Sequence, residues 1–331
     1  MQRFSYLRPA TVAEALAAVS EPGSQYLAGG TTQLDLMKDG VLAPARLVDL
    51  TRLPLATIGV EEGADAAVLR VGATATMQQL AAHPALDGLP MVREALLAGA
   101  SPQLRNMATI GGNLLQRTRC RYFRDPSVGA CNKRIPGSGC AAVLGHARMH
   151  AILGADEHCI ALHGSDLAVA LTAADAVLWI TGAGGDRTVP LTEFYRPAAE
   201  DPADENVLAA GDLITAMTIP LPATGTHSGY LKVRDRASYE FALTAAAVEL
   251  TIDEGTIRSA RIALGGVGTV PWRARRAEAA LVGAAAGPDA FRSAADAEVV
   301  DTFTVAGTAF KVELAKRTLV RQLHTVSGLP Q

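Results

Sequence analysis

Residues 26–38 read YLAGGTTQLDLMK, in which a short strand pattern ends at a Gly-Gly turn and a helical pattern begins. Glycine lets the backbone approach an anion closely, and the hydroxyls of Thr31 and Thr32 with the free N–H groups of the next helix can complete a phosphate cradle. Residues 108–113, ATIGGN, repeat the Gly-Gly arrangement about eighty residues later. Neither segment matches a Rossmann fingerprint or a P-loop, so two unrelated tight turns remain the alternative.

The segments around residues 26–38 predict an α+β fold with short strands. A small β-α-β-α-β unit ends by about residue 50, and a hairpin is expected over 56–72. Further strands are expected at 148–154, 158–162, 175–181 and 213–220. These strands and helices do not alternate regularly enough for a doubly wound sheet.

A change in composition at 220–229, PLPATGTHSG, predicts a domain boundary. Beyond it, three strand candidates are followed by helical patterns over roughly 272–283, 288–298 and 303–325. The C-terminal part is therefore predicted to be a three-stranded antiparallel sheet packed by helices. At 331 residues, the chain is long enough for two domains.

The charge composition argues against nucleic acid and membrane surfaces as partners. The chain carries 30 basic and 33 acidic residues, for a formal net charge of −3, which gives no support to a nucleic-acid or membrane-surface role. The first 19 residues lack the basic and apolar regions of a secretory signal, and no run approaches a membrane span. A cytoplasmic location is expected, with periplasmic export alongside a signal-bearing partner subunit as the alternative.

All the cysteines of the chain lie within a span of 40 residues, at Cys120, Cys131, Cys140 and Cys159. The first three belong to CRYFRDPSVGACNKRIPGSGC, residues 120–140, a sequence broken by Gly and Pro. The paired CxxC ligands typical of zinc modules are absent, and four lone thiols on a loop suit a 4Fe-4S cluster at least as well. From the spacing alone, a cluster, a zinc site, and inert or disulfide-bonded cysteines all remain open.

Basic residues and histidines surround these cysteines. The basic residues are Arg117, Arg119, Arg121, Arg124, Lys133 and Arg134. We expect them to stabilise a reduced cluster and to dock an acidic partner, with a solvated basic loop as the alternative. The histidines are set aside as ligands, since four cysteines already complete a cluster: His146, His150, His158 and His163. No hydrolytic arrangement is visible, so no catalytic side chain is assigned.

Together with QLRNMATIGGNLLQ and HGSDLAVAL, the motif at 26–38 resembles the FAD-binding (medium) subunits of the molybdenum hydroxylase (xanthine dehydrogenase) family, which includes carbon monoxide dehydrogenase and aldehyde oxidoreductases. KVRDRASYEFAL and FKVELAKRTLVRQL resemble that family's C-terminal domain, so the resemblance spans nearly the whole chain. It implies an FAD-binding PCMH-type domain over 1–222, with subdomains of about 1–53 and 54–222, followed by a C-terminal domain over 223–331.

LLQRTRCRYFRDPSVGACNKRIPGSGCA is similar to the bacterial periplasmic-type aldehyde oxidoreductases, whose flavin subunit carries an additional 4Fe-4S cluster. That resemblance implies a cluster insertion over about 117–160, with Cys120, Cys131, Cys140 and Cys159 as the metal ligands. The cluster is expected to be mainly structural, with some electronic coupling to the flavin.

The resemblance also implies which residues bind FAD. They are Tyr26, Leu27, Ala28, Gly29, Gly30, Thr31, Thr32, Gln33, Thr109, Gly111, Gly112, Asn113, Asp166, Ile214 and Lys232. The first eight would wrap the pyrophosphate, the next four would form a second cradle, and Asp166 would hydrogen-bond the cofactor. Ile214 and Lys232 would lie near the isoalloxazine ring. Without the family context, Asp166 reads as a helix N-cap and Lys232 as a solvated strand residue.

The function implied by the resemblance is electron transfer within a heterotrimer or a dimer of heterotrimers. A molybdenum-cofactor large subunit would oxidise an aldehyde or an aromatic heterocycle, and a small subunit with two 2Fe-2S clusters would relay the electrons. The FAD of this chain would pass them to an external acceptor, because a flavin converts one-electron into two-electron transfer. The alternative is a zinc-stabilised assembly or binding subunit without flavin.

Overall fold

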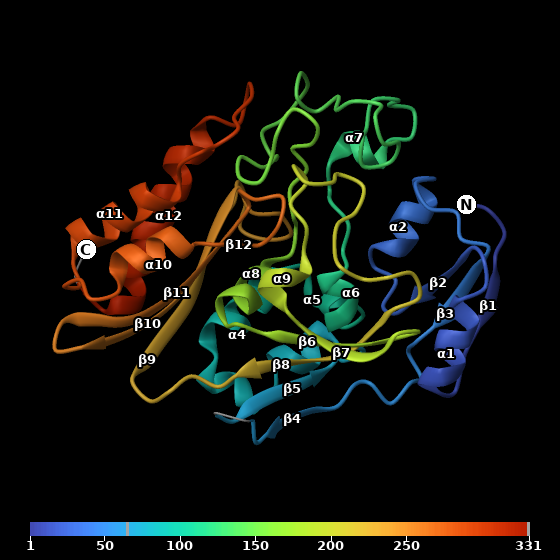
Figure 1. Cartoon of the computed structure of the whole chain (residues 1–331), viewed down its shortest axis with the longest axis horizontal. Coiled ribbons are helices and arrows are strands. Elements are labelled where there is room, and N and C mark those ends of the chain that lie inside the picture. Colours follow the sequence, from blue (N-terminus) through green and yellow to red (C-terminus); the bar gives the residue numbers. More distant parts are fainter. Residues whose placement is uncertain (64–65, 330–331) are drawn as a thin grey trace.

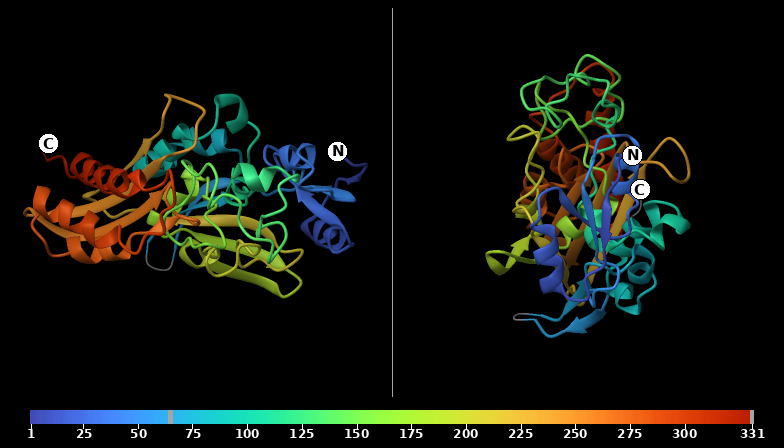
Figure 2. Two further views of the ribbon diagram at one scale, coloured as in Figure 1. Left: turned by 90° about the horizontal axis from the view of Figure 1, so that it is seen from above. Right: turned by 90° about the vertical axis from the view of Figure 1, so that its right-hand side faces the viewer.

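The computed structural model describes residues 1–63 and 66–329. Its three β-sheets follow one another along the molecule, with the N-terminal sheet towards one end and the C-terminal helices at the other (Figure 1, Figure 2). The architecture is of the α+β class predicted from the sequence. Among the described residues, no helix is long and apolar enough to cross a membrane.

The N-terminal sheet is parallel, with the strand order β1-β3-β2, and it forms the predicted β-α-β-α-β unit. Helix α1 begins after Thr11, whose hydroxyl accepts a hydrogen bond from the backbone N–H of Glu14 and so satisfies a free donor of the first turn. The elements are β1 (Ser5–Leu7), α1 (Val12–Val19), β2 (Ser24–Leu27), α2 (Gln33–Lys38) and β3 (Arg46–Asp49). Strand β2 therefore leads through the Gly-Gly turn into α2, as expected.

The middle sheet is antiparallel, with the strand order β4-β5-β8-β6-β7, and its first pair is the hairpin predicted over 56–72. Its strands are β4 (Ile58–Glu61), β5 (Val68–Gly72), β6 (Val177–Gly182), β7 (Gly185–Pro190) and β8 (Leu213–Pro220). The helices of this part are α3 (Met77–Ala81), α4 (Pro90–Ala98), α5 (Pro102–Arg105), α6 (Ile110–Leu114), α7 (Arg121–Arg124), α8 (Asp166–Ala173) and α9 (Leu191–Phe194), with a 3-10 turn, η1 (Pro84–Gly88). Helix α8 is buried from Leu167 to Ala173, which suits its uniformly apolar sequence.

The C-terminal sheet is antiparallel, with the strand order β12-β11-β10-β9. The expected three strands gain a short fourth one, because Trp272 and Arg273, predicted to begin a helix, instead pair with Leu264 and Ala263 of β11. The Arg273 side chain donates a hydrogen bond of 2.6 Å to the carbonyl oxygen of Thr172, which ties β12 to the end of α8. The elements are β9 (Thr226–Val233), β10 (Thr244–Asp253), β11 (Thr256–Gly265), β12 (Trp272–Arg273), α10 (Arg275–Leu281), α11 (Pro288–Glu298) and α12 (Phe310–Ser327).

Residues 148–154 and 158–162 do not form the strands expected from their apolar patterns. The structure has only isolated bridges there, and the backbone N–H groups of Ile152 and Leu153 both donate to the carbonyl oxygen of Val267, at 2.8 and 3.0 Å. Both side chains are buried in the C-terminal core. The apolar pattern therefore reflects burial against a distant part of the chain and not membership of a sheet.

Lys311, in the first turn of α12, is a fully buried cation between the C-terminal core and the segment that carries the cysteines. Its ammonium group donates hydrogen bonds to the carbonyl oxygens of His150, at 2.9 Å, and Gly266, at 2.7 Å. Burial, with a smaller contribution from Arg148, lowers the pKa of Lys311 from 10.5 to about 7. The protonated form is therefore costly in the folded protein.

We expect the free energy of unfolding to rise with pH between about 7 and 10.5, because over that interval the unfolded chain keeps the Lys311 proton that the folded protein releases. In Lys311→Met this contribution is absent, so the urea midpoint should rise less between these two pH values than in the wild type. Lys316→Met removes a more accessible lysine of the same helix and serves as the control. An unchanged pH dependence in Lys311→Met would contradict this assignment.

Candidate functional site

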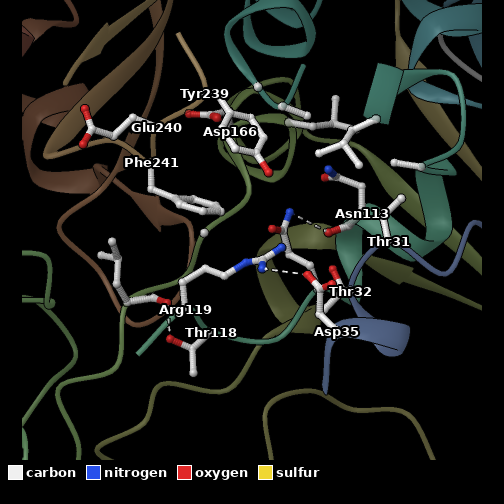
Figure 3. A pocket seen from close by; sticks show the side chains of 18 of the residues that line it. Thr31, Thr32, Asp35, Asn113, Thr118, Arg119, Asp166, Tyr239, Glu240 and Phe241 are labelled. Atoms are coloured by element: carbon white, nitrogen blue, oxygen red, sulfur yellow. Dashed lines mark hydrogen bonds and ion pairs between the residues drawn. The ribbon is translucent and has the colours of Figure 1, made fainter. Parts of the chain in front are cut away.

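A cavity of about 920 Å³ lies where the three parts of the chain meet (Figure 3). Its walls come from the β2–α2 loop, the start of α8, strand β9 and the segments around α6 and after β9. This volume is in the range of cofactor sites, which bury most of a ligand in one cleft. The predicted cofactor residues that line the cavity are Gly29, Gly30, Thr31, Thr32, Gly112, Asn113, Asp166 and Lys232.

The two Gly-Gly segments meet at one wall of this cavity. A Cβ atom on Gly29 would lie 2.0 Å from the carbonyl oxygen of Met107, so only glycine lets the β2–α2 loop approach this backbone so closely. Gly30 adopts a φ of +70°, in the left-handed region that favours glycine. A Cβ atom on Gly112 would meet only the hydroxyl of Thr109, at 2.8 Å. The two turns are therefore parts of one wall.

A buried group of polar side chains closes the opposite wall. Lys232 of β9 donates a hydrogen bond of 2.8 Å to Asp166 at the start of α8, and the Tyr230 hydroxyl donates one of 2.7 Å to the same carboxylate. The N-cap of α8 is Ser165, whose hydroxyl accepts from the N–H of Ala168 at 2.9 Å. Both alternative interpretations are therefore wrong, since Asp166 is not the cap and the Lys232 side chain is only 4% exposed.

The remaining predicted cofactor residues all lie in the described part of the chain, and none of them lines the cavity. The Tyr26 hydroxyl instead donates a hydrogen bond of 2.8 Å to the carbonyl oxygen of Gly211, and Ile214 is buried within β8. Thr109 caps α6 through the N–H of Gly112. The other four are Leu27, Ala28, Gln33 and Gly111. Their roles in binding FAD stay predictions.

Sequence reasoning did not assign several side chains that line the cavity. The loop between β9 and β10 supplies Arg236, Tyr239, Glu240 and Phe241, and Arg119 extends between this loop and Asp35 of α2 (Figure 3). The Arg119 guanidinium lies 5.3 Å from the centre of the Phe241 ring, and its Nη1 lies 3.4 Å from Oδ2 of Asp35. The signal in the sequence was the polar and aromatic run RDRASYEF, which breaks the apolar pattern between two strands.

All four cysteines line a second, smaller cavity. Cys120 lines both cavities, so the two adjoin. Cys131 and Cys140 form an isolated antiparallel bridge through their backbones, and all four thiols are free, so the disulfide alternative is wrong for this structure. Among the described residues, no three or more His, Cys, Asp or Glu side chains form a group that could hold a metal ion.

Burial dominates the electrostatics of two of the thiols, Cys120 and Cys159. It raises the pKa of Cys120 and that of Cys159 to about 11, and repulsion from the neighbouring cysteines adds to this effect. His150, which the sequence gave no reason to include, has its Nε2 3.2 Å from the Sγ of Cys120, and burial lowers its pKa to about 4. The imidazole is therefore neutral at pH 7 and can hydrogen-bond the sulfur. With their pKa raised in this way, Cys120 and Cys159 become thiolates at neutral pH only where a positive group accompanies them.

The basic residues around the cysteines are mostly paired within the chain. Arg117 and Lys133 both form ion pairs with Glu205, at 2.5 and 2.9 Å. Arg134 donates hydrogen bonds to backbone carbonyl oxygens of its own loop, including that of Asp125 at 2.6 Å. These cations therefore hold the segment in place, and the docking of an acidic partner stays a prediction.

Comparisons with known proteins agree with this geometry. Two family models match the chain: "FAD binding domain in molybdopterin dehydrogenase" over residues 2–222, and "CO dehydrogenase flavoprotein C-terminal domain" over residues 229–326. The aldehyde oxidoreductase FAD-binding subunit PaoB of Escherichia coli K12 is 47% identical over 326 residues, which are 98% of this chain and 98% of that protein. The carbon monoxide dehydrogenase medium chain of Afipia carboxidovorans is 30% identical, over 85% of this chain and 81% of that protein.

Among solved structures, a chain of the Cu,Mo-CO dehydrogenase in its cyanide-inactivated form matches with a TM-score of 0.77 and 28% identity, covering 98% of both chains. The fold and the cavity thus define an FAD-binding subunit of an oxidoreductase. The chain belongs to the flavoprotein subunits of the molybdopterin dehydrogenases, the molybdenum hydroxylase family that its motifs resemble.

The close approach at Gly29 gives a direct test of the cavity wall. In Gly29→Ala the added Cβ would overlap the carbonyl oxygen of Met107, so the β2–α2 loop must move away from the 107–112 segment. We expect FAD to bind at least about tenfold more weakly, a cost of about 1.4 kcal/mol. Gly59→Ala, where an added Cβ meets nothing within 4 Å, should keep wild-type affinity in fluorescence titrations of flavin-depleted protein. Equal affinities of the two variants would contradict the assignment.

Proposed function

We propose that this chain is the FAD- and 4Fe-4S-binding electron-transfer subunit of a molybdenum-dependent aldehyde oxidoreductase. It receives electrons from a 2Fe-2S small subunit and delivers them to an external acceptor. The observation that carries the proposal is the pair of adjoining cavities: both Gly-Gly segments line one, all four cysteines line the other, and Cys120 belongs to both. The full-length similarity to an aldehyde oxidoreductase FAD-binding subunit favours an aldehyde over an aromatic heterocycle as the substrate of the complex.

The larger cavity fits FAD in size and in chemistry. At its glycine wall, Gly30 and Gly112 leave the backbone open to an anionic group. In this proposal, residues 26–33 wrap the pyrophosphate through the part that lines the cavity, residues 29–32, and Thr109, Gly111, Gly112 and Asn113 form a second cradle of which Gly112 and Asn113 line it. Asp166 hydrogen-bonds the cofactor, and Ile214 and Lys232 lie near the isoalloxazine ring. Bound FAD supplies the conversion between one-electron and two-electron transfer.

The side chains of the cavity orient the cofactor and set its surroundings. Lys232 is a buried cation whose position is fixed by Asp166 and by a hydrogen bond of 3.1 Å to the carbonyl oxygen of Ala98. A cation fixed in advance stabilises negative charge without reorganisation, which favours a reduced cofactor. Phe241 and Arg119 also line the cavity, with the guanidinium 5.3 Å from the centre of the ring. No side chain is assigned as a general acid or base.

The proposal places a 4Fe-4S cluster among the four cysteines. Four cysteine thiolates are the ligand set of such a cluster, and Cys120, Cys131, Cys140 and Cys159 surround one space. Three small apolar cores lie in this region, and each contains Cys120 and one other cysteine: Cys131, Cys140 or Cys159. A cluster here would join these small cores, which supports a mainly structural role with some electronic coupling to the flavin.

The proposal includes the organisation of the chain and its partners. An FAD-binding domain over 1–222, with the cluster insertion at about 117–160, precedes a C-terminal domain over 223–331. The partners are a molybdenum-cofactor large subunit and a 2Fe-2S small subunit. Support for these partners comes from the relatives, several of which are medium chains of dehydrogenases.

The competing interpretation is a zinc-stabilised assembly subunit without flavin, since four thiolates also suit zinc. Metal, sulfide and flavin analysis of the purified protein separates the two. We expect four irons, four acid-labile sulfides and one FAD for each chain, the composition of one 4Fe-4S cluster and one flavin. Stoichiometric zinc in a colourless protein would refute the proposal. FAD without iron would refute the cluster assignment and still support the flavin assignment.

A further inference from the structure

The segment that carries the cysteines also forms part of the flavin cavity. Thr118, Arg119, Cys120 and Arg121 all line that cavity, and Cys120 lines the cysteine cavity as well. Residues 117–160, all of them described by the structure, contain one short helix, α7, and no strand. Local turns hold most of this segment, such as the hydrogen bond of 2.8 Å from the N–H of Asn132 to the carbonyl oxygen of Gly139. A metal cluster bound by all four cysteines would restrict these turns further.

This cysteine segment, residues 117–160, packs directly on α2, the helix that follows the β2–α2 loop. Phe123 and Cys131 form a buried apolar cluster with Leu36 of α2, and Val41 and Leu42 pack against it. Leu36 and Phe123 are each only 1% exposed. Figure 1 shows α7 and α2 close together at the top of the molecule. The contact is therefore a small buried apolar core that joins α2 to the cysteine segment.

Two ion pairs flank this core. Arg119 reaches Asp35 at 3.4 Å, and Arg124 of α7 reaches Asp39, at the C-cap of α2, also at 3.4 Å. Arg124 is the more buried of the two, with 14% of its side chain exposed, and its Nε donates to the carbonyl oxygen of Thr118 at 3.1 Å. Arg124 therefore holds the start of the cysteine segment and the end of α2 together.

Helix α2 faces the two sites on opposite sides. Leu34, Asp35 and Lys38 line the flavin cavity, whereas Leu36 packs against the cysteine segment. The glycine loop that enters the cavity is joined directly to α2, and an added Cβ on Gly30 would touch the Leu34 side chain at 3.1 Å. A shift of α2 would therefore move the loop that the flavin contacts.

From these contacts we propose that metal binding by the four cysteines and FAD binding are cooperative, with the α2–α7 contact as the link. The inference rests on the proposed function, since it requires a metal cluster in one cavity and FAD in the other. A loaded cysteine segment presents Phe123 and Arg124 to α2 in a fixed position, whereas an unloaded segment must be ordered when FAD binds. Coupling of this kind is reciprocal, so bound FAD also retains the cluster.

The test compares the FAD dissociation constants of the wild type and Cys131→Ser in the assembled complex, with iron content measured on the same samples. We expect FAD to bind about tenfold more weakly to the iron-depleted variant, a coupling in the usual range. An unchanged dissociation constant in an iron-depleted, folded variant would overturn the coupling alone. The small subunit would contribute four irons in its two 2Fe-2S clusters, so a wild-type complex with only those four irons would overturn both the coupling and the proposed cluster. The two failures are therefore distinguishable.

A second pair of variants tests the link itself. Arg124→Met should weaken FAD binding severalfold in the iron-loaded protein and have no further effect in Cys131→Ser, because the contact is already lost there. Arg258→Met, which breaks an exposed ion pair of 3.1 Å with Asp253, is the matched control and should change neither iron nor FAD. If Arg124→Met weakens FAD binding by the same factor in the iron-loaded protein and in Cys131→Ser, the coupling does not pass through α2.

Reciprocity gives a readout that needs no cysteine variant and so does not depend on the folding of Cys131→Ser. Wild-type complex with and without FAD is equilibrated with increasing concentrations of an iron chelator, and the 4Fe-4S cluster is followed by a spectroscopic signal distinct from that of the 2Fe-2S clusters of the small subunit. We expect the FAD-free complex to lose half of its 4Fe-4S cluster at an about tenfold lower chelator concentration than the FAD-loaded complex. Equal chelator midpoints with and without FAD would overturn the proposal.

Discussion

The close approach of two backbones at Gly29 is the constraint on which the site depends. No other residue fits there, because a Cβ atom would lie 2.0 Å from the carbonyl oxygen of Met107. This contact brings the N-terminal parallel sheet against the middle part of the chain and places two Gly-Gly segments, distant in sequence, at one wall. The flavin cavity exists only because these segments meet, and the Asp166–Lys232 pair then joins that half to the C-terminal sheet.

The cysteine segment adds a second constraint to this frame. It has almost no regular secondary structure, yet it contributes to the flavin cavity and packs on α2 through Phe123 and Leu36. Its arginines serve mainly to pair with acidic groups and backbone carbonyls within the chain. In the proposed account, a metal cluster cross-links this irregular segment, and the two cofactors stabilise each other through the contact between α2 and α7.

Much of this architecture could be predicted from local sequence, and the rest could not, for physical reasons. The turn and helix signals at residues 26–38 are local, so the β-α-β-α-β unit could be predicted from them. The family motifs pointed to Asp166 as a cofactor residue, and it does line the cavity. Residues 148–162 were predicted wrongly because an apolar pattern reports burial and not the partner that causes it. The place of Phe241 in the cavity wall was missed, and Arg119 was assigned only to the cysteine segment, because their contact with each other is tertiary. The cysteine spacing indicated a metal site without specifying which metal.

The central claim is that one segment holds a cluster beside a flavin, and its most direct test is the structure of the purified complex with anomalous scattering measured at the iron edge. The account predicts a strong iron peak between the sulfur atoms of Cys120, Cys131, Cys140 and Cys159, and density for FAD in the cavity between Gly29 and Lys232. A peak that appears only at the zinc edge, or a disulfide between two of these cysteines, would contradict it.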